Sequence, residues 1–209
     1  TSSRRQRQMC IRDRLNEDPI VLVIKNFISN ESCDLIFKDA QNKLFKRAEV
    51  IDENNNVKIS KGRDNQTYII PRLSVESVEQ AMKKIKETFS LETNDLTKAQ
   101  IQKYSKNQKY SSHFDSFFSK KHLQQESRSQ RKLSFILYLN EVLEGGETFF
   151  PLMDLKVQPL KGNLLVFQNC FGDTDYLHPK SLHESKPVLK GEKYILNFWA
   201  SKLLPKGCF

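Results

Sequence analysis

Residues 192–199 read Glu-Lys-Tyr-Ile-Leu-Asn-Phe-Trp, an apolar run with one cation near its start, and this run is the basis of the fold prediction. On a β-strand, residues i and i+2 point to the same side, so Lys193 shares a side with Ile195, Asn197 and Trp199. If that side faces the interior of a β-sandwich, burying the ammonium group is costly unless it pairs with an anion. The run therefore predicts an interior strand that carries a charge for binding.

Further strand signals occur in the same part of the chain. We expect strands at residues 101–104, 132–139, 148–150, 164–167 and 194–200, with turns at Gly145-Gly146, 159–162 and Lys190-Gly191. Short strands at this spacing are typical of a sandwich or barrel, so residues 99–205 are expected to form a jelly-roll core.

Residues 15–98 have a different pattern and are expected to form a helical support region. Apolar residues recur at helical spacing in residues 31–46, after a cap at Ser29, and in residues 75–89, after a cap at Ser74. A buried strand is expected within residues 18–27, another at 67–70, and a hairpin or loop at 49–64. The fold class is therefore α+β, mainly β: a double-stranded β-helix (jelly-roll) core buttressed by N-terminal helices.

The 209 residues suit a single domain, and we place its start at residue 15. Residues 1–14 resemble the translation of an adapter DNA used in sequencing; the alternative is a genuine disordered basic arm. We expect them to be a non-native or disordered leader. Their net charge of +4 is part of the total of +9, and the remainder of about +5 does not require a nucleic-acid partner.

Two further composition signals bear on location. No apolar run approaches the roughly 20 residues that cross a bilayer, so no membrane association is expected. Without Cys10 the cysteines are odd in number and none forms a CxxC pair, which favours a reducing, cytoplasmic location. The sequence leaves the oligomeric state open.

The chemistry is predicted to centre on His113-Phe114-Asp115 and the distant His183. Two imidazoles and one carboxylate occupy one face of an octahedral ferrous ion and leave three positions for a bidentate 2-oxo acid and dioxygen. Lys193 stands ten residues after His183, where it can hold the far carboxylate of 2-oxoglutarate. We expect His113 and Asp115 at the end of one strand and His183 on a strand across the mouth of the barrel.

Two other histidines are rival ligands. His122 lies among lysines and polar residues, which is typical of a solvated loop. His178 precedes Pro179 in a turn and has no cation at a comparable distance. His183 is therefore the better candidate.

From about residue 21 to residue 201 the chain resembles the prolyl 4-hydroxylase branch of the Fe(II)- and 2-oxoglutarate-dependent dioxygenases. The matching positions come in the family's order: Tyr104, Tyr110, His113-x-Asp115, Arg131, Tyr138-Leu139-Asn140, Gly145-Gly146-Glu147-Thr148-Phe149-Phe150-Pro151, Pro159-x-Lys161-Gly162, Phe167, His183, Pro187-Val188, Gly191-x-Lys193 and Trp199.

The resemblance implies a role for each of the chemical residues. His113, Asp115 and His183 would hold Fe(II), and Lys193 would bind the C5 carboxylate of 2-oxoglutarate. Hydroxyls for this cosubstrate would come from Tyr104 and Tyr138, and Trp199 and Arg63 would lie near the substrate. The tyrosines and Trp199 can equally be plain core residues. The Gly145–Thr148 segment is assigned a structural role.

The implied reaction is hydroxylation of an unactivated C–H bond, at C4 of a prolyl residue in a peptide, with O2 as oxidant and ascorbate as reductant. Hydroxylation of a free amino acid, demethylation of nucleic acid, a zinc hydrolase and a non-catalytic binding module remain alternatives. Two glycines usual in the family are replaced, by Asn107, which tolerates the left-handed conformation, and by Ser185. Ser185 is expected to narrow the pocket or to change substrate choice.

Overall fold

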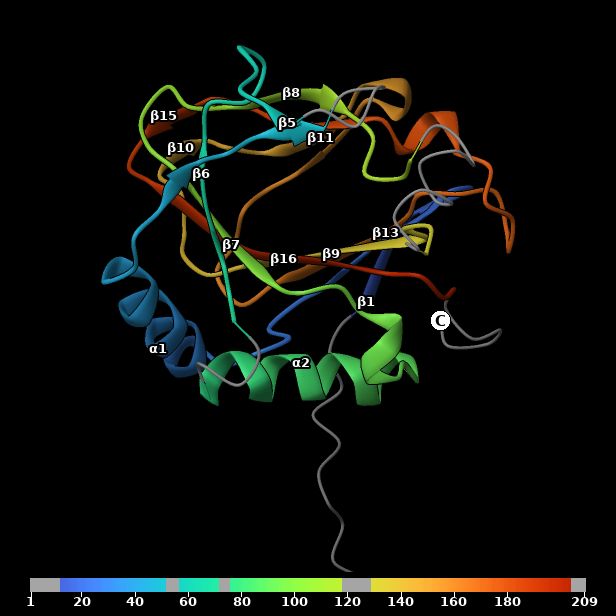
Figure 1. The fold of residues 1–209 in the computed structure, drawn as a ribbon, viewed down its shortest axis with the longest axis horizontal. Coiled ribbons are helices and arrows are strands. Elements are labelled where there is room, and N and C mark those ends of the chain that lie inside the picture. Colours follow the sequence, from blue (N-terminus) through green and yellow to red (C-terminus); the bar gives the residue numbers. More distant parts are fainter. Residues whose placement is uncertain (1–11, 52–56, 72–75, 118–128, 204–209) are drawn as a thin grey trace, which may run out of the picture.

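The computed structural model describes residues 12–51, 57–71, 76–117 and 129–203. Within these ranges the largest element is an eight-stranded sheet, with antiparallel pairing throughout (Figure 1). Its strands, in spatial order, are β1 (Arg12–Glu17), β2 (Ile20–Ile24), β13 (Leu164–Gln168), β9 (Leu133–Tyr138), β16 (Lys193–Ala200), β7 (Gln100–Tyr104), β6 (Gln66–Ile69) and β3 (Lys46–Arg47).

A smaller sheet lies over one face of the large sheet, and the helices α1 (Asn30–Gln41) and α2 (Glu76–Phe89) lie over the other (Figure 1). In the described residues the smaller sheet has the order β12 (Leu155–Val157), β11 (Thr148–Phe150), β14 (His183–Ser185) and β8 (Tyr110–His113). Two short pairs accompany it, β4 (Val50–Ile51) with β5 (Val57–Lys58) and β10 (Glu144–Gly145) with β15 (Val188–Lys190). The predicted jelly-roll buttressed by helices is confirmed.

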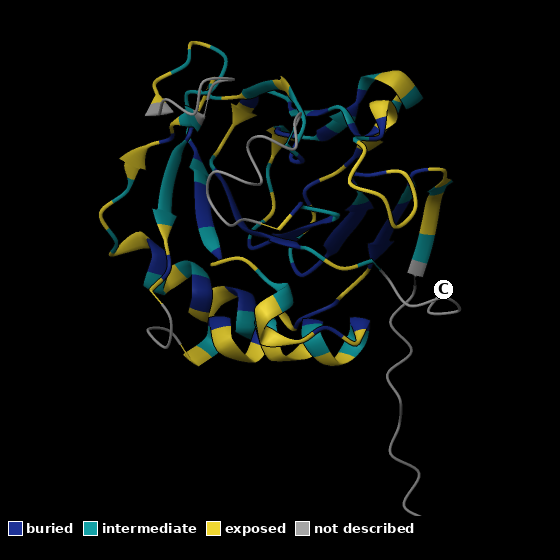
Figure 2. Ribbon diagram, turned by 45° about the vertical axis from the view of Figure 1, so that its right-hand side comes forward, coloured by how far each residue is buried: buried dark blue, intermediate teal, exposed yellow. Residues whose placement is uncertain are grey.

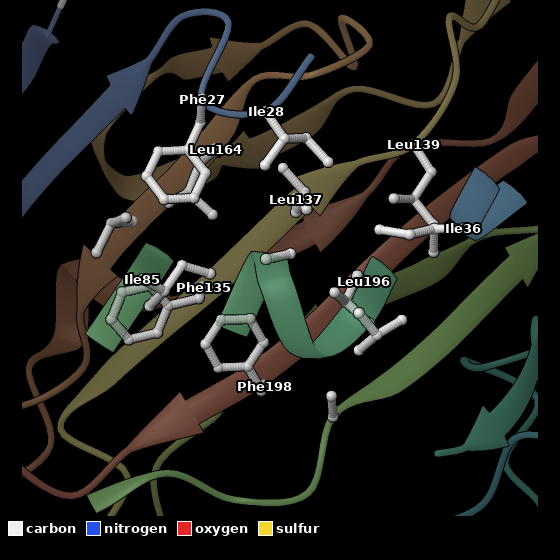
Figure 3. Close-up of a cluster of buried hydrophobic side chains, with 14 of the residues drawn as sticks. Phe27, Ile28, Ile36, Ile85, Phe135, Leu137, Leu139, Leu164, Leu196 and Phe198 are labelled. Carbon is white, nitrogen blue, oxygen red and sulfur yellow. The ribbon is translucent and has the colours of Figure 1, made fainter. Parts of the chain in front are cut away.

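The apolar residues form one core on each face of the large sheet, because side chains alternate along its central strands. Phe135 and Leu137 on β9 and Phe198 on β16 pack against α1 and α2 (Figure 3). Ile136 and Tyr138 on β9 and Ile195 on β16 lie between the two sheets. The central strands are therefore buried on both faces (Figure 2). Each large apolar side chain so buried stabilises the fold by roughly 1.5–3 kcal/mol.

Helix α1 begins where the sequence predicted, since Ser29 Oγ accepts a hydrogen bond from the Ser32 N–H at 3.2 Å. It ends at Gln41 rather than at residue 46, and Asn42 caps it by donating to the Asp39 carbonyl. The predicted extension was wrong because Lys46–Arg47 pair with β6, so the chain must turn back before them. Helix α2 has the predicted course, and the expected cap at Ser74 lies outside the described residues.

The N-terminal part of the fold is a hairpin of β1 and β2. Strand β1 begins at Arg12, three residues before the boundary placed at residue 15, and Asp13 pairs with Lys25 of the following segment. Residues 1–11 lie outside the described residues. In the described part of the chain no helix is both long enough and apolar enough to cross a membrane.

Candidate metal centre

Two neighbouring strands of the smaller sheet bring the predicted histidines together. His113 ends β8 and His183 begins β14, and their Cα atoms are direct partners in the antiparallel register. The expectation that His183 lies on a strand across the barrel mouth was wrong, because β14 pairs with β8 itself. The ring centroids are 4.3 Å apart.

Asp115 completes the cluster from just beyond the end of β8. The His113 Nε2 atom lies 3.6 Å from Asp115 Oδ1, and the His183 Nε2 atom lies 3.7 Å from Asp115 Oδ2. Asp115 is outside the strand, so strand alternation does not explain how it joins His113, as the sequence had suggested. Among the described residues these three form the one group of potential metal ligands, with ligand atoms within 4.8 Å of one another.

Backbone carbonyls fix the orientation of both imidazoles. The Nδ1 atom of His113 lies 2.9 Å from the Ser111 carbonyl oxygen, and that of His183 lies 3.0 Å from the Ser181 carbonyl oxygen. A carbonyl only accepts, so each Nδ1 carries a proton, and a ring in its neutral form presents its Nε2 lone pair to the cluster. Burial, together with the nearby His113, lowers the pKa of His183 to about 4, which favours this neutral form.

The large sheet holds the carboxylate of Asp115. Ser134 Oγ on β9 donates to Asp115 Oδ2 at 2.5 Å, and Asn169 Nδ2 donates to the Ser134 oxygen at 2.8 Å. Burial by itself would raise the pKa of Asp115, but the neighbouring histidines and the Ser134 hydrogen bond outweigh burial and hold the pKa well below its usual range. A carboxylate and two imidazoles on one side fit Fe(II) and leave positions open for other ligands.

The rival histidine His178 does not take part in the cluster. His178 is buried near the N-terminal hairpin, where its Nδ1 accepts from the Lys180 N–H and its Nε2 lies 3.2 Å from Asp18 Oδ1. Its Nε2 has no hydrogen-bond partner in the described part of the chain, and neither nitrogen belongs to the group of potential metal ligands. His122 lies outside the described residues.

Lys193 lies at the inner end of the same cleft, with only 1% of its surface exposed. Its Nζ donates to the Gly146 carbonyl at 2.7 Å and to Ser185 Oγ at 2.8 Å. Burial lowers the pKa of Lys193 from 10.5 to about 7, and the negative charge of Glu147 only partly opposes this. Lys193, Ile195, Asn197 and Trp199 all line the cleft, so the predicted side of the strand is confirmed.

The two candidate tyrosines differ in their position. Tyr104 lines the cleft, and its hydroxyl donates to Gln102 Oε1 at 2.8 Å. Tyr138 is completely buried behind the cleft wall, with its hydroxyl 2.9 Å from Thr148 Oγ1, and it is Thr148 that reaches the wall. Burial raises the pKa of both tyrosines well above the usual value, so both hydroxyls keep their protons.

The substrate-side candidates lie at the outer part of the cleft, which has a volume of about 1300 Å³. Arg63 lies over the ring of Tyr110, 4.5 Å from its centroid, and Tyr110 in turn stacks on His113 at 3.5 Å. The guanidinium of Arg131 lies 3.8 Å from the centroid of Trp199, and both residues line the cleft. Trp199 Nε1 is buried without a hydrogen-bond partner in the described part of the chain.

Sequence reasoning missed several residues of this site. The sequence predicts Ser134 and Thr148 only as parts of strands, yet one positions Asp115 and the other lines the cleft. Gly145 and Gly146 have φ angles of +77° and +74°, as a turn requires, but the Gly146 carbonyl also accepts from Lys193. The usable signal was side-chain alternation, since Ser134 faces the same side of β9 as Ile136.

Known proteins resemble this chain in both sequence and structure. A family model described as the 2OG-Fe(II) oxygenase superfamily matches residues 99–201. A protein of Acanthamoeba polyphaga mimivirus, named as a prolyl 4-hydroxylase, is 31% identical over 180 residues, covering 85% of this chain and 72% of the relative. Prolyl 4-hydroxylase 13 of Arabidopsis thaliana is 29% identical over 208 residues, covering 88% of this chain and 72% of the relative.

The solved structures agree with this. The 2OG complex of the viral collagen prolyl hydroxylase from Paramecium Bursaria Chlorella virus-1 has a TM-score of 0.68 and 25% identity, covering 86% of this chain and 94% of that chain. The histidines and the aspartate that meet in the cleft are a donor set for Fe(II). The chain therefore belongs to the prolyl 4-hydroxylase branch of the Fe(II)- and 2-oxoglutarate-dependent dioxygenases.

Proposed function

We propose that this dioxygenase hydroxylates C4 of a prolyl residue within a peptide or protein. The observation that carries the proposal is a single cleft with three metal-ligating side chains on one wall and the buried ammonium of Lys193 at its inner end. The names of its relatives supply the substrate class.

His113, Asp115 and His183 would hold Fe(II) through the two Nε2 atoms and the carboxylate. Lys193 would pair with the C5 carboxylate of 2-oxoglutarate, with the Tyr104 hydroxyl beside it. When bound, the iron with 2-oxoglutarate and O2 supplies the oxidising power that converts C–H to C–OH and releases succinate and carbon dioxide. Ascorbate is our proposed reductant for keeping the iron ferrous.

The chain's own residues would orient these groups and keep water out. Ser134 holds the Asp115 carboxylate toward the histidines, and the two backbone carbonyls hold the imidazole tautomers. Ile136 and Ile195 give an apolar wall to the cleft that contains the metal-ligating residues and Lys193. Such a wall strengthens the attraction between Lys193 and a carboxylate, because it excludes water from the pair.

A peptide substrate is favoured over a free amino acid by the extent of the cleft. Beyond the metal centre it continues over the outer strands β3 and β6 of the large sheet, past Arg47 and Ile69. Its volume of about 1300 Å³ exceeds the roughly 300–1,000 Å³ of pockets that enclose small molecules. Neither a nucleic-acid partner nor membrane association is part of the proposal, and a cytoplasmic location remains our expectation.

The test is an anaerobic titration with Fe(II) and 2-oxoglutarate, followed by turnover in air. We expect a weak visible charge-transfer band, and then succinate and hydroxyproline in step when a proline-rich peptide is supplied. Free proline at the same concentration is the matched arm. Equal turnover of free proline would contradict the peptide substrate, and no band with no succinate would contradict the whole proposal.

A further inference from the structure

Ser185 stands on β14 between the metal centre and Lys193. It follows His183 by two residues, lines the same cleft, and is 8% exposed. In the register of the smaller sheet its Cα partners are Thr148 on β11 and Tyr110 on β8. Its side chain is thus surrounded by residues of the site, where its replacement of glycine is expected to narrow the pocket or to change substrate choice.

The hydroxyl of Ser185 is one of two acceptors that locate the buried ammonium group. Lys193 Nζ donates to Ser185 Oγ at 2.8 Å and to the Gly146 carbonyl at 2.7 Å. An ammonium group has three N–H donors. In the described part of the chain Lys193 Nζ donates to two acceptors, the Gly146 carbonyl and Ser185 Oγ, so its third N–H is left for a ligand. Lys193 has a flexible four-carbon stem, and the two bonds hold its end at one place.

The proton of the Ser185 hydroxyl is also available to a ligand. Because the oxygen accepts from Lys193, the proton must point elsewhere, and the Tyr104 hydroxyl, which neighbours Ser185 in the same cleft, is one acceptor for it. Tyr104 uses its own proton on Gln102 at 2.8 Å, so it can accept from Ser185. A carboxylate placed against Lys193 would compete for the Ser185 proton, as an ionised acceptor is the stronger one.

We propose that Ser185 is a positioning and specificity residue for the far carboxylate of the 2-oxo acid. It fixes the ammonium of Lys193, donates its own hydroxyl to the carboxylate, and limits how far from the metal that carboxylate can lie. The site thereby selects a five-carbon 2-oxo diacid over the six-carbon 2-oxoadipate. This inference rests on the proposed use of 2-oxoglutarate, and it assigns a task to a side chain that a glycine could not perform.

The test measures dissociation constants of the anaerobic Fe(II) protein for three ligands. 2-Oxoglutarate and 2-oxoadipate differ by one methylene, and oxalate chelates the metal without a distant carboxylate. The variants are Ser185→Ala and Ser185→Gly, with Ser105→Ala as control, because Ser105 bonds Glu192 outside the cleft. Ligand-induced changes in melting temperature give a second readout that needs no turnover.

We expect both Ser185 variants to weaken the binding of 2-oxoglutarate about tenfold and the binding of oxalate less than twofold. The variants lose a hydrogen bond to the far carboxylate of 2-oxoglutarate, a group that oxalate does not have. In Ser185→Gly the preference for 2-oxoglutarate over 2-oxoadipate should fall about tenfold. Ser105→Ala should match the parent protein with all three ligands.

Three results would overturn the inference: unchanged 2-oxoglutarate affinity in both variants, an equal loss for oxalate, or an unchanged preference between the two diacids in Ser185→Gly. Oxalate binding also reports whether a variant has kept its metal site and fold. If the parent protein itself does not bind 2-oxoglutarate, the proposed function fails. If it binds and the variants behave as the parent does, the inference about Ser185 fails alone.

Discussion

Replacing Lys193 by methionine should change how the stability of the metal-free protein depends on pH. The ammonium group is fully buried, and burial moves its pKa from 10.5 to about 7. A displacement of 3.5 pKa units corresponds to about 5 kcal/mol of unfavourable free energy for the charged, folded form. A methionine side chain at this position would fill a similar volume without a charge, so this unfavourable contribution should disappear in the variant.

The direction follows from where the proton is bound. Below pH 7 Lys193 is protonated in both the folded and the unfolded chain, and the full destabilisation is present. Between pH 7 and pH 10.5 the unfolded chain keeps the proton and the folded chain loses it, so the parent protein becomes more stable as pH rises. Relative to Lys193→Met, the parent should gain about 2 kcal/mol between pH 7.5 and 9, since the slope approaches about 1.4 kcal/mol per pH unit.

Urea unfolding of both proteins, with metal chelated and at several pH values, measures this difference. Other lysines and tyrosines titrate equally in the two proteins and cancel in the comparison. A difference in unfolding free energy that stays constant from pH 7.5 to pH 9 would refute the reasoning. Lys193 would then have an ordinary pKa in the folded protein.

Three further predictions test the centre and the core. His183→Ala should abolish the charge-transfer band of the anaerobic Fe(II) and 2-oxoglutarate complex, whereas His178→Ala should keep it; the reverse would exchange their assignments. Ser134→Ala should weaken Fe(II) binding about 10- to 100-fold, as the aspartate ligand loses its hydroxyl donor, and a metal titration giving parent affinity would count against that role. Phe135→Ala should lower the free energy of unfolding by about 3–5 kcal/mol, because Phe135 is completely buried under the helices, while exposed Leu152→Ala should change it by less than about 0.5 kcal/mol. Urea unfolding of both variants decides this last case, and equal losses would contradict the assigned core.

The sequence predicted the parts of the site that depend on periodicity and spacing. Alternation placed Lys193, Asn197 and Trp199 on the cleft side of β16, and all three line the cleft. The expected left-handed backbone at Asn107 is confirmed by a φ of +68°. Both are local properties, which a short window of sequence contains.

The parts that the sequence did not predict depend on contacts between distant residues. His113 and His183 are direct cross-strand partners. The residues of one strand do not determine which other strand lies beside it. The hydrogen bond from Ser134 to Asp115 joins two sheets, and a serine in an apolar strand gives no sign of its partner. Tyr138 shows the converse, since its family position suggested a ligand contact and its hydroxyl is used by Thr148.

Strand β8 lies at the edge of the four-stranded sheet. Its last residue, His113, is a metal-ligating side chain, and so is its register partner on β14, His183. A single ion held by both imidazoles would therefore act as a cross-link between an outer strand and its neighbour in that sheet. Amide protons of residues 110–113 should then exchange with solvent much more slowly after metal is added. On its outer side β8 is paired with residues 60–64, since the Ser111 N–H donates to the Gly62 carbonyl and Arg63 forms a β-bridge with Tyr110. Metal depletion should therefore loosen β8 together with this segment before it unfolds the rest of the domain.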